Sequence, residues 1–172
     1  MLVGHLSSFT MAQVVSYGNF KLAEQEILFQ KVVSQDSITI QKLETYYKAL
    51  PYVSDLEVNG DELQFTMKDI NVDYKKFQFS QVNTPIILQT GKFTGIVSVS
   101  VKDGRYRITV KAIQFTGNLG YKMITEPDNL TRYATKNSGT TFAEDWSKPT
   151  MLGLLDKAFS DKLEYKATEE EW

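Results

Sequence analysis

The segment Gly91–Phe115 alternates apolar and polar residues in two stretches that meet at Lys102–Gly104. Valines alternate with serines over Val97–Val101, and the return stretch alternates in the same way over Tyr106–Ala112. A period of two turns one set of side chains toward a core and the other toward solvent. The chain is therefore constrained to a fold built around a long antiparallel hairpin, with one buried and one solvated face.

The region before this hairpin predicts a strand and then a helix. Ile27–Val33 is rich in β-branched residues and indicates the first strand. Apolar residues at helical spacing then predict an amphipathic helix over Ser37–Leu50, which Pro51 ends. Asp36 or Ser37 is expected to cap the helix N-terminus, because both side chains can accept a hydrogen bond from the first turn.

A second hairpin is predicted around Asn59-Gly60, since Asn-Gly tolerates the positive φ angles of a tight turn. Its strands are expected at Val53–Val58 and Asp61–Met67. The alternation continues over Asp69–Phe79, which predicts another strand. The short apolar run Ile86–Leu88 fits either a short strand or a covered loop.

The last third of the chain begins with a weakly patterned stretch. Glycine, proline and asparagine recur over Thr116–Trp146 and predict a long connection, of a length that tends to be functional or wrapped over a face. A helix is expected over Lys148–Tyr165, with Ser147 as its N-cap. Residues 166–172 read as an acidic tail.

Composition excludes several kinds of chemistry. The chain has no cysteine, so disulfides, thiolate metal sites and cysteine nucleophiles are ruled out. Its single histidine, His5, lies in the first few residues, so we expect neither a histidine-based catalytic centre nor a metal site. A formal net charge of -2 argues against a dedicated nucleic-acid partner. No apolar run is long enough for a transmembrane segment.

The N-terminus resembles the end of a secretory signal. Thr10-Met11-Ala12 before Gln13 has the small residues of a cleavage site, although no positive region precedes it. We therefore expect residues 1–13 to be a signal-peptide remnant, residues 14–165 to form one α+β domain, and the protein to be exported to the periplasm or cell envelope. A plain N-terminal tail is the alternative.

Three parts of the chain resemble family 4468 of the domains of unknown function. They are the strand and helix of Ile27–Leu50, the hairpin Val97–Phe115 with VKDGRYRITV at its centre, and Trp146 with the helix after it. The segment Asp55–Phe79 departs from the family pattern, because a glycine-rich turn is expected there. The resemblance implies a TBP-like fold in exported proteins of Bacteroides-type bacteria. It implies no activity, because none is established for the family.

The solvated face of the long hairpin carries the candidate binding residues. Arg105, Arg107 and Lys111 share this face with Thr109, and Ser98 and Ser100 are expected opposite them. Cations beside hydroxyls can bind an anionic group or an acidic partner. The alternative is an ordinary solvated sheet face, whose long charged side chains prevent aggregation.

Three other patterns indicate a functional site more weakly. Asp69–Asp73 resembles the start of a calcium loop, but Tyr74 and Ser80 stand where the EF-hand needs glycine and glutamate. Carboxylates around Pro127 and before Trp146 could serve a carboxylate-only hydrolase if they converged, but as loop residues they fit helix caps better. A further set of aromatic residues either fills the core or lines an apolar cavity: Tyr46, Tyr47, Tyr52, Phe65, Phe77 and Phe79.

Together these patterns predict an α+β protein in which one antiparallel sheet carries two helices on one face. The function expected is that of a non-enzymatic binding module, with no cofactor. It would bind a protein or small-molecule partner on the uncovered sheet face or on the connection Thr116–Asp145. The alternative is a carrier of a small apolar ligand held between the sheet and the helices.

Overall fold

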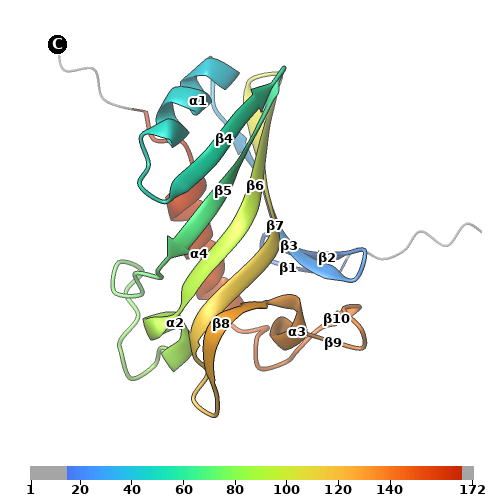
Figure 1. Cartoon of the computed structure of the whole chain (residues 1–172), viewed down its shortest axis with the longest axis vertical. Coiled ribbons are helices and arrows are strands. Elements are labelled where there is room, and N and C mark those ends of the chain that lie inside the picture. Colours follow the sequence, from blue (N-terminus) through green and yellow to red (C-terminus); the bar gives the residue numbers. More distant parts are fainter. Residues whose placement is uncertain (1–14, 168–172) are drawn as a thin grey trace, which may run out of the picture.

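The computed structural model describes residues 15–167 and contains one large antiparallel sheet with helices packed on it (Figure 1). Its strand order is β1-β2-β3-β7-β6-β5-β4, and β8 pairs with the far part of β7. The strands are β1 (Ser16–Tyr17), β2 (Phe20–Ala23), β3 (Glu26–Ser34), β4 (Val53–Asn59), β5 (Glu62–Ile70), β6 (Lys92–Lys102), β7 (Arg105–Asn118) and β8 (Met123–Asn129).

The long hairpin forms the middle of the sheet, as the sequence predicts. β6 and β7 pair antiparallel and turn at Asp103-Gly104, where both residues have positive φ. The predicted hairpin around Asn59-Gly60 is also present as β4 and β5, and the strand predicted at Ile27–Val33 is β3. β3 pairs with β7, so the two halves of the chain meet at the centre of the sheet.

One register row explains where the core lies. Phe29, Val110, Val97 and Phe65 stand directly opposite one another across β3, β7, β6 and β5. Successive residues of a strand point to opposite faces, so the whole row lies on one face of the sheet. All four side chains are buried, and this face carries the helices.

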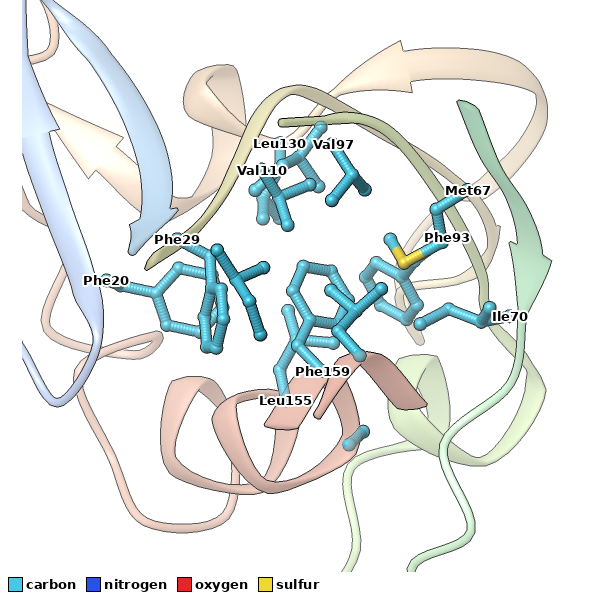
Figure 2. Packing of buried hydrophobic residues seen from close by; sticks show 14 of the residues in the cluster. Phe20, Phe29, Met67, Ile70, Phe93, Val97, Val110, Leu130, Leu155 and Phe159 are labelled. Carbon is cyan, nitrogen blue, oxygen red and sulfur yellow. The ribbon is translucent and has the colours of Figure 1, made fainter. Parts of the chain in front are cut away.

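The helix α4 (Leu152–Leu163) covers the middle of this face (Figure 2). The Phe159 ring lies 5.5 Å from Phe29 and 5.9 Å from Phe20, measured between ring centroids. A third ring, Phe93, lies 6.4 Å from Phe159 on the other side. Edge-on and tilted aromatic contacts at this spacing add to the apolar burial that holds the helix on the sheet.

The helix α1 (Ile40–Lys48) covers the same face at the β4–β5 end, where Tyr47 packs 4.8 Å from Phe65. It is shorter than the predicted Ser37–Leu50. Its N-cap is Thr39, whose hydroxyl accepts a hydrogen bond from the Lys42 backbone N–H, and neither Asp36 nor Ser37 has this role. The prediction failed here because all three residue types cap helices well.

The strand predicted over Asp69–Phe79 is wrong beyond Ile70. β5 ends at Ile70, which pairs with Phe93 near the start of β6. Beyond that pair no strand continues alongside, so the backbone groups of the following residues have no ladder to join. The segment turns away from the sheet instead, although the side chain of one of its residues, Val72, is still buried.

The run Ile86–Leu88 belongs to a short helix, α2 (Ile86–Thr90), and is neither a strand nor a loop. The Thr90 hydroxyl donates a hydrogen bond to the Ile86 carbonyl one turn earlier. Three adjacent apolar residues cannot distinguish a strand from one turn of helix, which explains the error.

The long connection Thr116–Trp146 is structured, contrary to expectation. It contains the end of β7, then β8, the helical turn α3 (Thr131–Ala134) and a small hairpin of β9 (Thr135–Lys136) and β10 (Thr141–Phe142). β8 runs along an edge of the sheet, and Pro127 lies where the β7–β8 register is irregular and gives it no paired residue, so its missing N–H is tolerated. Ile124 is its one fully buried side chain, so the strand has almost no apolar alternation to reveal it.

The C-terminal helix begins later and ends earlier than Lys148–Tyr165. Residues 147–151 form bends and turns, and Ser147 is not an N-cap, since its hydroxyl donates to the Ala143 carbonyl.

No sequence pattern predicted the hairpin β1–β2, which lies against α4. The Asp156 carboxylate accepts hydrogen bonds from the Asn19 backbone N–H at 2.7 Å and from its side-chain amide at 2.8 Å.

Candidate functional site

The uncovered face of the sheet places the six predicted binding residues on two adjacent strands. We call Ser98, Ser100, Arg105, Arg107, Thr109 and Lys111 the basic face. On β7, Tyr106, Ile108 and Val110 point into the core, so the residues between them point outward. The register pairs Ser98 with Thr109 and Ser100 with Arg107, which is the arrangement expected from the hairpin.

Thr109 differs from the rest of the basic face because it is covered. Only 8% of its surface is exposed, and its hydroxyl accepts a hydrogen bond from the Gln30 side-chain amide at 3.3 Å. Gln30 stands directly opposite Thr109 on β3. Thr109 therefore shapes the floor of the face and is poorly placed to contact a partner.

The cations of the basic face are free to bind. Arg105, Arg107 and Lys111 are exposed, and none of them forms an ion pair within residues 15–167. Most ion pairs within residues 15–167 lie instead on α1, at α4 or near α3. Glu62, opposite Ser100 on β5, is the nearest acidic position in the register.

Two shallow hollows lie side by side on this face. One has a volume of about 250 Å³ and is bordered by Ser98, Ser100, Arg107, Thr109 and Lys111 together with Leu28, Gln30 and Glu62. The other, of about 340 Å³, is bordered by Val32, Ser100, Lys102, Arg105, Tyr106 and Arg107. They share Ser100 and Arg107, which makes this pair the centre of the face.

The side chains in this arrangement are of the types that can bind negative charge. A guanidinium offers several N–H donors in a fixed plane and binds carboxylate or phosphate in pairs of hydrogen bonds. A serine hydroxyl beside it can add another donor. A guanidinium has hydrogen-bond donors and no acceptor, so these side chains can bind and orient an anion.

A different hollow, of about 560 Å³, lies against the outer side of α1. It is bordered by Gln41, Lys42, Thr45, Tyr46, Ala49, Leu50, Tyr165 and Lys166. Of the aromatic residues considered for an interior cavity, Tyr47 and Phe65 are fully buried against each other, and the other four are partly buried against the core. Sequence reasoning named Tyr46 but missed Tyr165, because nothing in the pattern shows that α1 meets the chain after α4.

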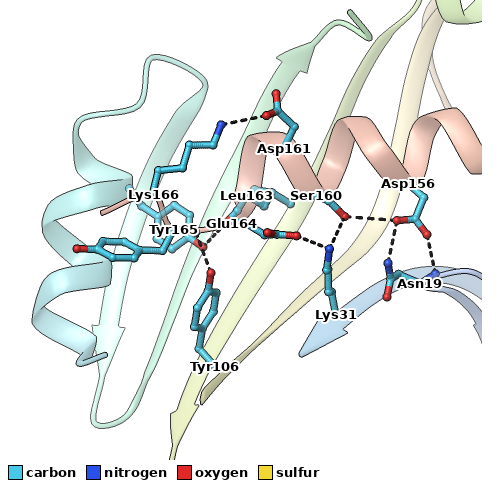
Figure 3. A network of polar contacts seen from close by, with 11 residues as sticks. Asn19, Lys31, Tyr106, Asp156, Ser160, Asp161, Leu163, Glu164, Tyr165 and Lys166 are labelled. Carbon is cyan, nitrogen blue, oxygen red and sulfur yellow. Dashed lines mark hydrogen bonds and ion pairs between the residues drawn. The ribbon is translucent and has the colours of Figure 1, made fainter. Parts of the chain in front are cut away.

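Four tyrosines make hydrogen bonds at the C-terminal end of α4. Two lie on α1, one lies just after α1, and one lies on β7. The hydroxyls of Tyr52, Tyr47 and Tyr46 donate to the carbonyls of Lys162, Leu163 and Glu164 in turn. These are the carbonyls that a helix end leaves without partners. The Tyr165 backbone N–H donates to the Tyr106 hydroxyl at 2.8 Å (Figure 3). We call these four tyrosines, Tyr46, Tyr47, Tyr52 and Tyr106, the tyrosine clamp.

Burial changes the acidity of the clamp, because an ionised phenol loses its hydration inside the protein. It raises the pKa of Tyr52 to about 12. It also raises the pKa of Tyr106 to about 12, although the hydrogen bond from Tyr165 works in the opposite direction. The clamp hydroxyls thus stay protonated and act as structural partners.

Two of the carboxylates considered for hydrolysis, Asp128 and Glu144, pair with nearby side chains. Asp128 accepts hydrogen bonds from the Tyr133 hydroxyl at 2.8 Å and from the Arg132 guanidinium at 3.0 Å. These two bonds, the one from Tyr133 above all, lower the pKa of Asp128. Glu144 lies 3.4 Å from the Lys136 ammonium. Within residues 15–167, no three acidic or histidine side chains gather as a metal site would need.

These observations define an α+β protein in which one antiparallel sheet carries its two longer helices on one face, as the sequence predicts. The chain matches no protein-family model and no curated protein. It is similar to the crystal structure of a DUF4468 family protein from Bacteroides ovatus, with 13% identity, a TM-score of 0.45, and coverage of 84% of this chain and 83% of that one.

A TBP-like protein from Parabacteroides distasonis is also similar, with 10% identity and a TM-score of 0.42 over 79% of this chain and 84% of that one. The first name is that of the family that the sequence resembles, and the second is that of the fold that this resemblance implies. Within residues 15–167, no helix has the length and apolar character needed to cross a bilayer.

Proposed function

We propose that this protein is an exported, non-enzymatic binding module of the cell envelope, and that its basic face holds an acidic partner. The observation that supports this most is the set of three exposed cations on β7 that have no ion-pair partner within residues 15–167. Charges that only keep a surface soluble are usually interspersed with opposite charges. Here Arg105, Arg107 and Lys111 follow one another along one side of one strand.

The partner is expected to carry carboxylates or phosphates at a spacing that matches alternate residues of β7. Alternate residues of a strand are about 6–7 Å apart, which suits an extended acidic segment better than a single small anion. Ser100 and Arg107 stand at the middle of the face and would make the central contacts. The two hollows leave room for the partner's side chains on either side of them.

The test is charge reversal at Arg105→Glu with Arg107→Glu. Both side chains are exposed, so we expect the melting temperature to stay within about 2 °C of the wild type, since surface substitutions rarely change stability. Capture of specific partners from envelope extract, measured by quantitative mass spectrometry, should fall by about tenfold or more.

The matched control is Lys148→Glu with Lys157→Glu. It makes the same change in net charge with exposed lysines on and just before α4, away from the basic face. Partners that the lysine variant still captures, but the arginine variant does not, are bound by the basic face. Equal capture by the wild type and the arginine variant would rule out the proposal.

The apolar hollow against α1 supports a second candidate function, carriage of a small apolar ligand. Its volume of about 560 Å³ lies in the range of ligand pockets, and Tyr46, Ala49, Leu50 and Tyr165 supply an apolar border. The ligand would lie outside α1 and not between the sheet and the helices.

Mass spectrometry of protein purified from its own host decides between the two candidates. A native mass that exceeds the denatured mass by a few hundred daltons, and loses the excess in Ala49→Trp, would establish the carrier. Equal native and denatured masses would leave the basic face as the working site.

A further inference from the structure

Four large apolar side chains are exposed together at one end of the molecule. Val82 is 94% exposed, Tyr121 80%, Met123 58% and Ile86 40%. We call these four residues the apolar tip. Figure 1 shows that α2, which begins with Ile86, lies at the same end of the long axis as the turn joining β7 to β8. This turn contains Tyr121, and Met123 follows it as the first residue of β8. Single exposed apolar residues are common, but four at one end are not an ordinary surface.

The segments that carry the apolar tip are joined to each other. The Asn118 backbone N–H donates to the Thr90 hydroxyl at 3.3 Å, which links the β7–β8 turn to α2. A Cβ on Gly117 would lie only 2.8 Å from the Gly91 Cα, so the two backbones are in close contact. The Gln89 side-chain amide donates to the carbonyls of Gln81 and Thr84 and ties the loop containing Val82 to α2.

The turn that presents Tyr121 is itself ordered. The Leu119 N–H donates to the Lys122 carbonyl at 2.9 Å, and the Gly120 N–H donates to the Asn118 side chain at 2.7 Å. Ile124 and Leu88 are buried just behind the exposed residues and anchor both segments in the core. The exposed side chains are thus held outward by a supported structure.

The two segments that carry the apolar tip contain charge of one sign only. Lys92 and Lys122 are the only charged residues in 80–92 and 116–124, and both are exposed. Lys122 lies between Tyr121 and Met123 in the sequence. No acidic residue occurs in either segment, although the whole chain carries more acidic than basic residues.

We propose that the apolar tip inserts into the interface of a lipid bilayer that contains anionic lipids. Aliphatic and aromatic side chains on projecting turns can enter the boundary between headgroups and acyl chains, and tyrosine suits that depth because its ring is apolar and its hydroxyl polar. Lysines beside them can reach the lipid phosphates. A bilayer adapts to a protruding tip, whereas a protein partner would need a groove shaped to receive it.

The absence of cysteine gives a direct test. A single cysteine at Met123→Cys can be labelled with a dye whose emission shifts to the blue in an apolar environment, and Val58→Cys, at the tip of the β4–β5 hairpin, is the matched control. On vesicles of phosphatidylcholine with phosphatidylglycerol, we expect a blue shift at position 123 and none at 58. No shift at 123, or equal shifts at both, would overturn the proposal.

Substitutions then measure what each group contributes to vesicle binding by the full chain. Tyr121→Ser with Met123→Ser should weaken binding by about tenfold or more, because two apolar side chains no longer leave water. Val32→Ser is the matched control, since it removes an exposed apolar residue from the uncovered sheet face. Lys122→Glu should weaken binding to anionic vesicles by about fivefold and to pure phosphatidylcholine much less.

Two results would assign the surface differently and so overturn the proposal. If Arg105→Glu with Arg107→Glu abolishes vesicle binding while the tip variants bind normally, the basic face is what contacts lipid. If the tip variants instead change the sedimentation of the protein without vesicles, the apolar tip joins two copies of the chain. The arginine variant also separates this proposal from the proposed function, because the two surfaces share no residue.

Discussion

At the scale of single residues, the tyrosine clamp shows how polar atoms are matched inside this protein. Tyr47 is fully buried, and its hydroxyl has a buried carbonyl of α4 as its partner. Within residues 15–167, every buried side-chain nitrogen or oxygen has a hydrogen-bond partner. Removal of one hydroxyl therefore leaves one acceptor without a donor, which costs more than an average hydrogen bond is worth.

We predict that Tyr47→Phe lowers the free energy of unfolding by about 1–2 kcal/mol, because the Leu163 carbonyl stays buried without its donor. Urea denaturation measures this directly. Tyr46→Phe is the matched control: it removes the neighbouring bond to Glu164 at a half-buried position, where water can replace the hydroxyl. A Tyr47→Phe variant as stable as the wild type would show that the bond contributes nothing.

The clamp also predicts how stability depends on alkaline pH. The folded-state pKa of Tyr52 and of Tyr106 is about 12, whereas an unfolded tyrosine titrates near about 10. The folded state therefore holds more protons than the unfolded state between these values, so stability is intact below about pH 10 and falls as the pH rises toward 12. A Tyr52→Phe variant should lose less stability over this window in urea titrations at successive pH values.

At the scale of elements, Asp156 links the N-terminal hairpin β1–β2 to α4 (Figure 3). Its carboxylate also accepts from the Ser160 hydroxyl, which in turn accepts from Lys31. Lys31 also forms an ion pair with Glu164, so a chain of polar contacts connects β3 with α4. The sequence gives no sign of this, because the partners are more than a hundred positions apart.

We predict that Asp156→Ala destabilises the fold by about 2 kcal/mol, since two hydrogen bonds to a charged group are lost together. Hydrogen exchange should show the largest loss of protection in β1 and β2. Asp36→Ala removes an exposed carboxylate from a turn and should leave both measurements unchanged. Uniform loss of protection across the sheet would mean that Asp156 does not act on this hairpin in particular.

The elements differ in how well the sequence reveals them. The hairpin β6–β7 was predicted with its turn and, as far as Lys111, with its two faces, because a period of two persists there on both strands. The alternation placed Ala112 with the buried residues, and this was wrong, since Ala112 is exposed. β8 was missed because its pairing with β7, and not an alternating pattern of its own, holds it in the sheet. α2 was missed because three adjacent apolar residues fit a strand, a loop or a turn of helix equally well. Capping residues set the start of α1 within a few residues and could not choose among adjacent candidates.

The bulge in β7 shows a subtler limit. Ala112 has a positive φ, and the register with β6 shifts by one residue there. The extra residue lets Val110 and Ile113 both face the core although they are three positions apart. Simple alternation carried past this point assigns every later side chain to the wrong face, and a sequence pattern of one strand cannot place such a shift.

At the scale of the whole molecule, the sequence placed the basic face correctly and missed the rest of the surface. Ser98, Ser100, Arg105, Arg107 and Lys111 lie together, because pairing across one hairpin brings them together without any long-range contact. The apolar tip forms only because α2 and the β7–β8 turn lie against each other. The hollow against α1 forms only because the chain after α4 passes beside α1. Both depend on tertiary packing that no local pattern records.

The role of α4 has a consequence for how the chain is made. Tyr47 meets a partner 116 positions later, and Asn19 meets one 137 positions later. Phe20 and Phe29 contact each other through their rings, and the third ring of this cluster, Phe159, comes only with α4. During synthesis the core beneath α4 therefore stays incomplete until this helix has left the ribosome. A nascent chain that stays open for so long is accessible to chaperones and to secretion machinery, which act on polypeptides before they have folded.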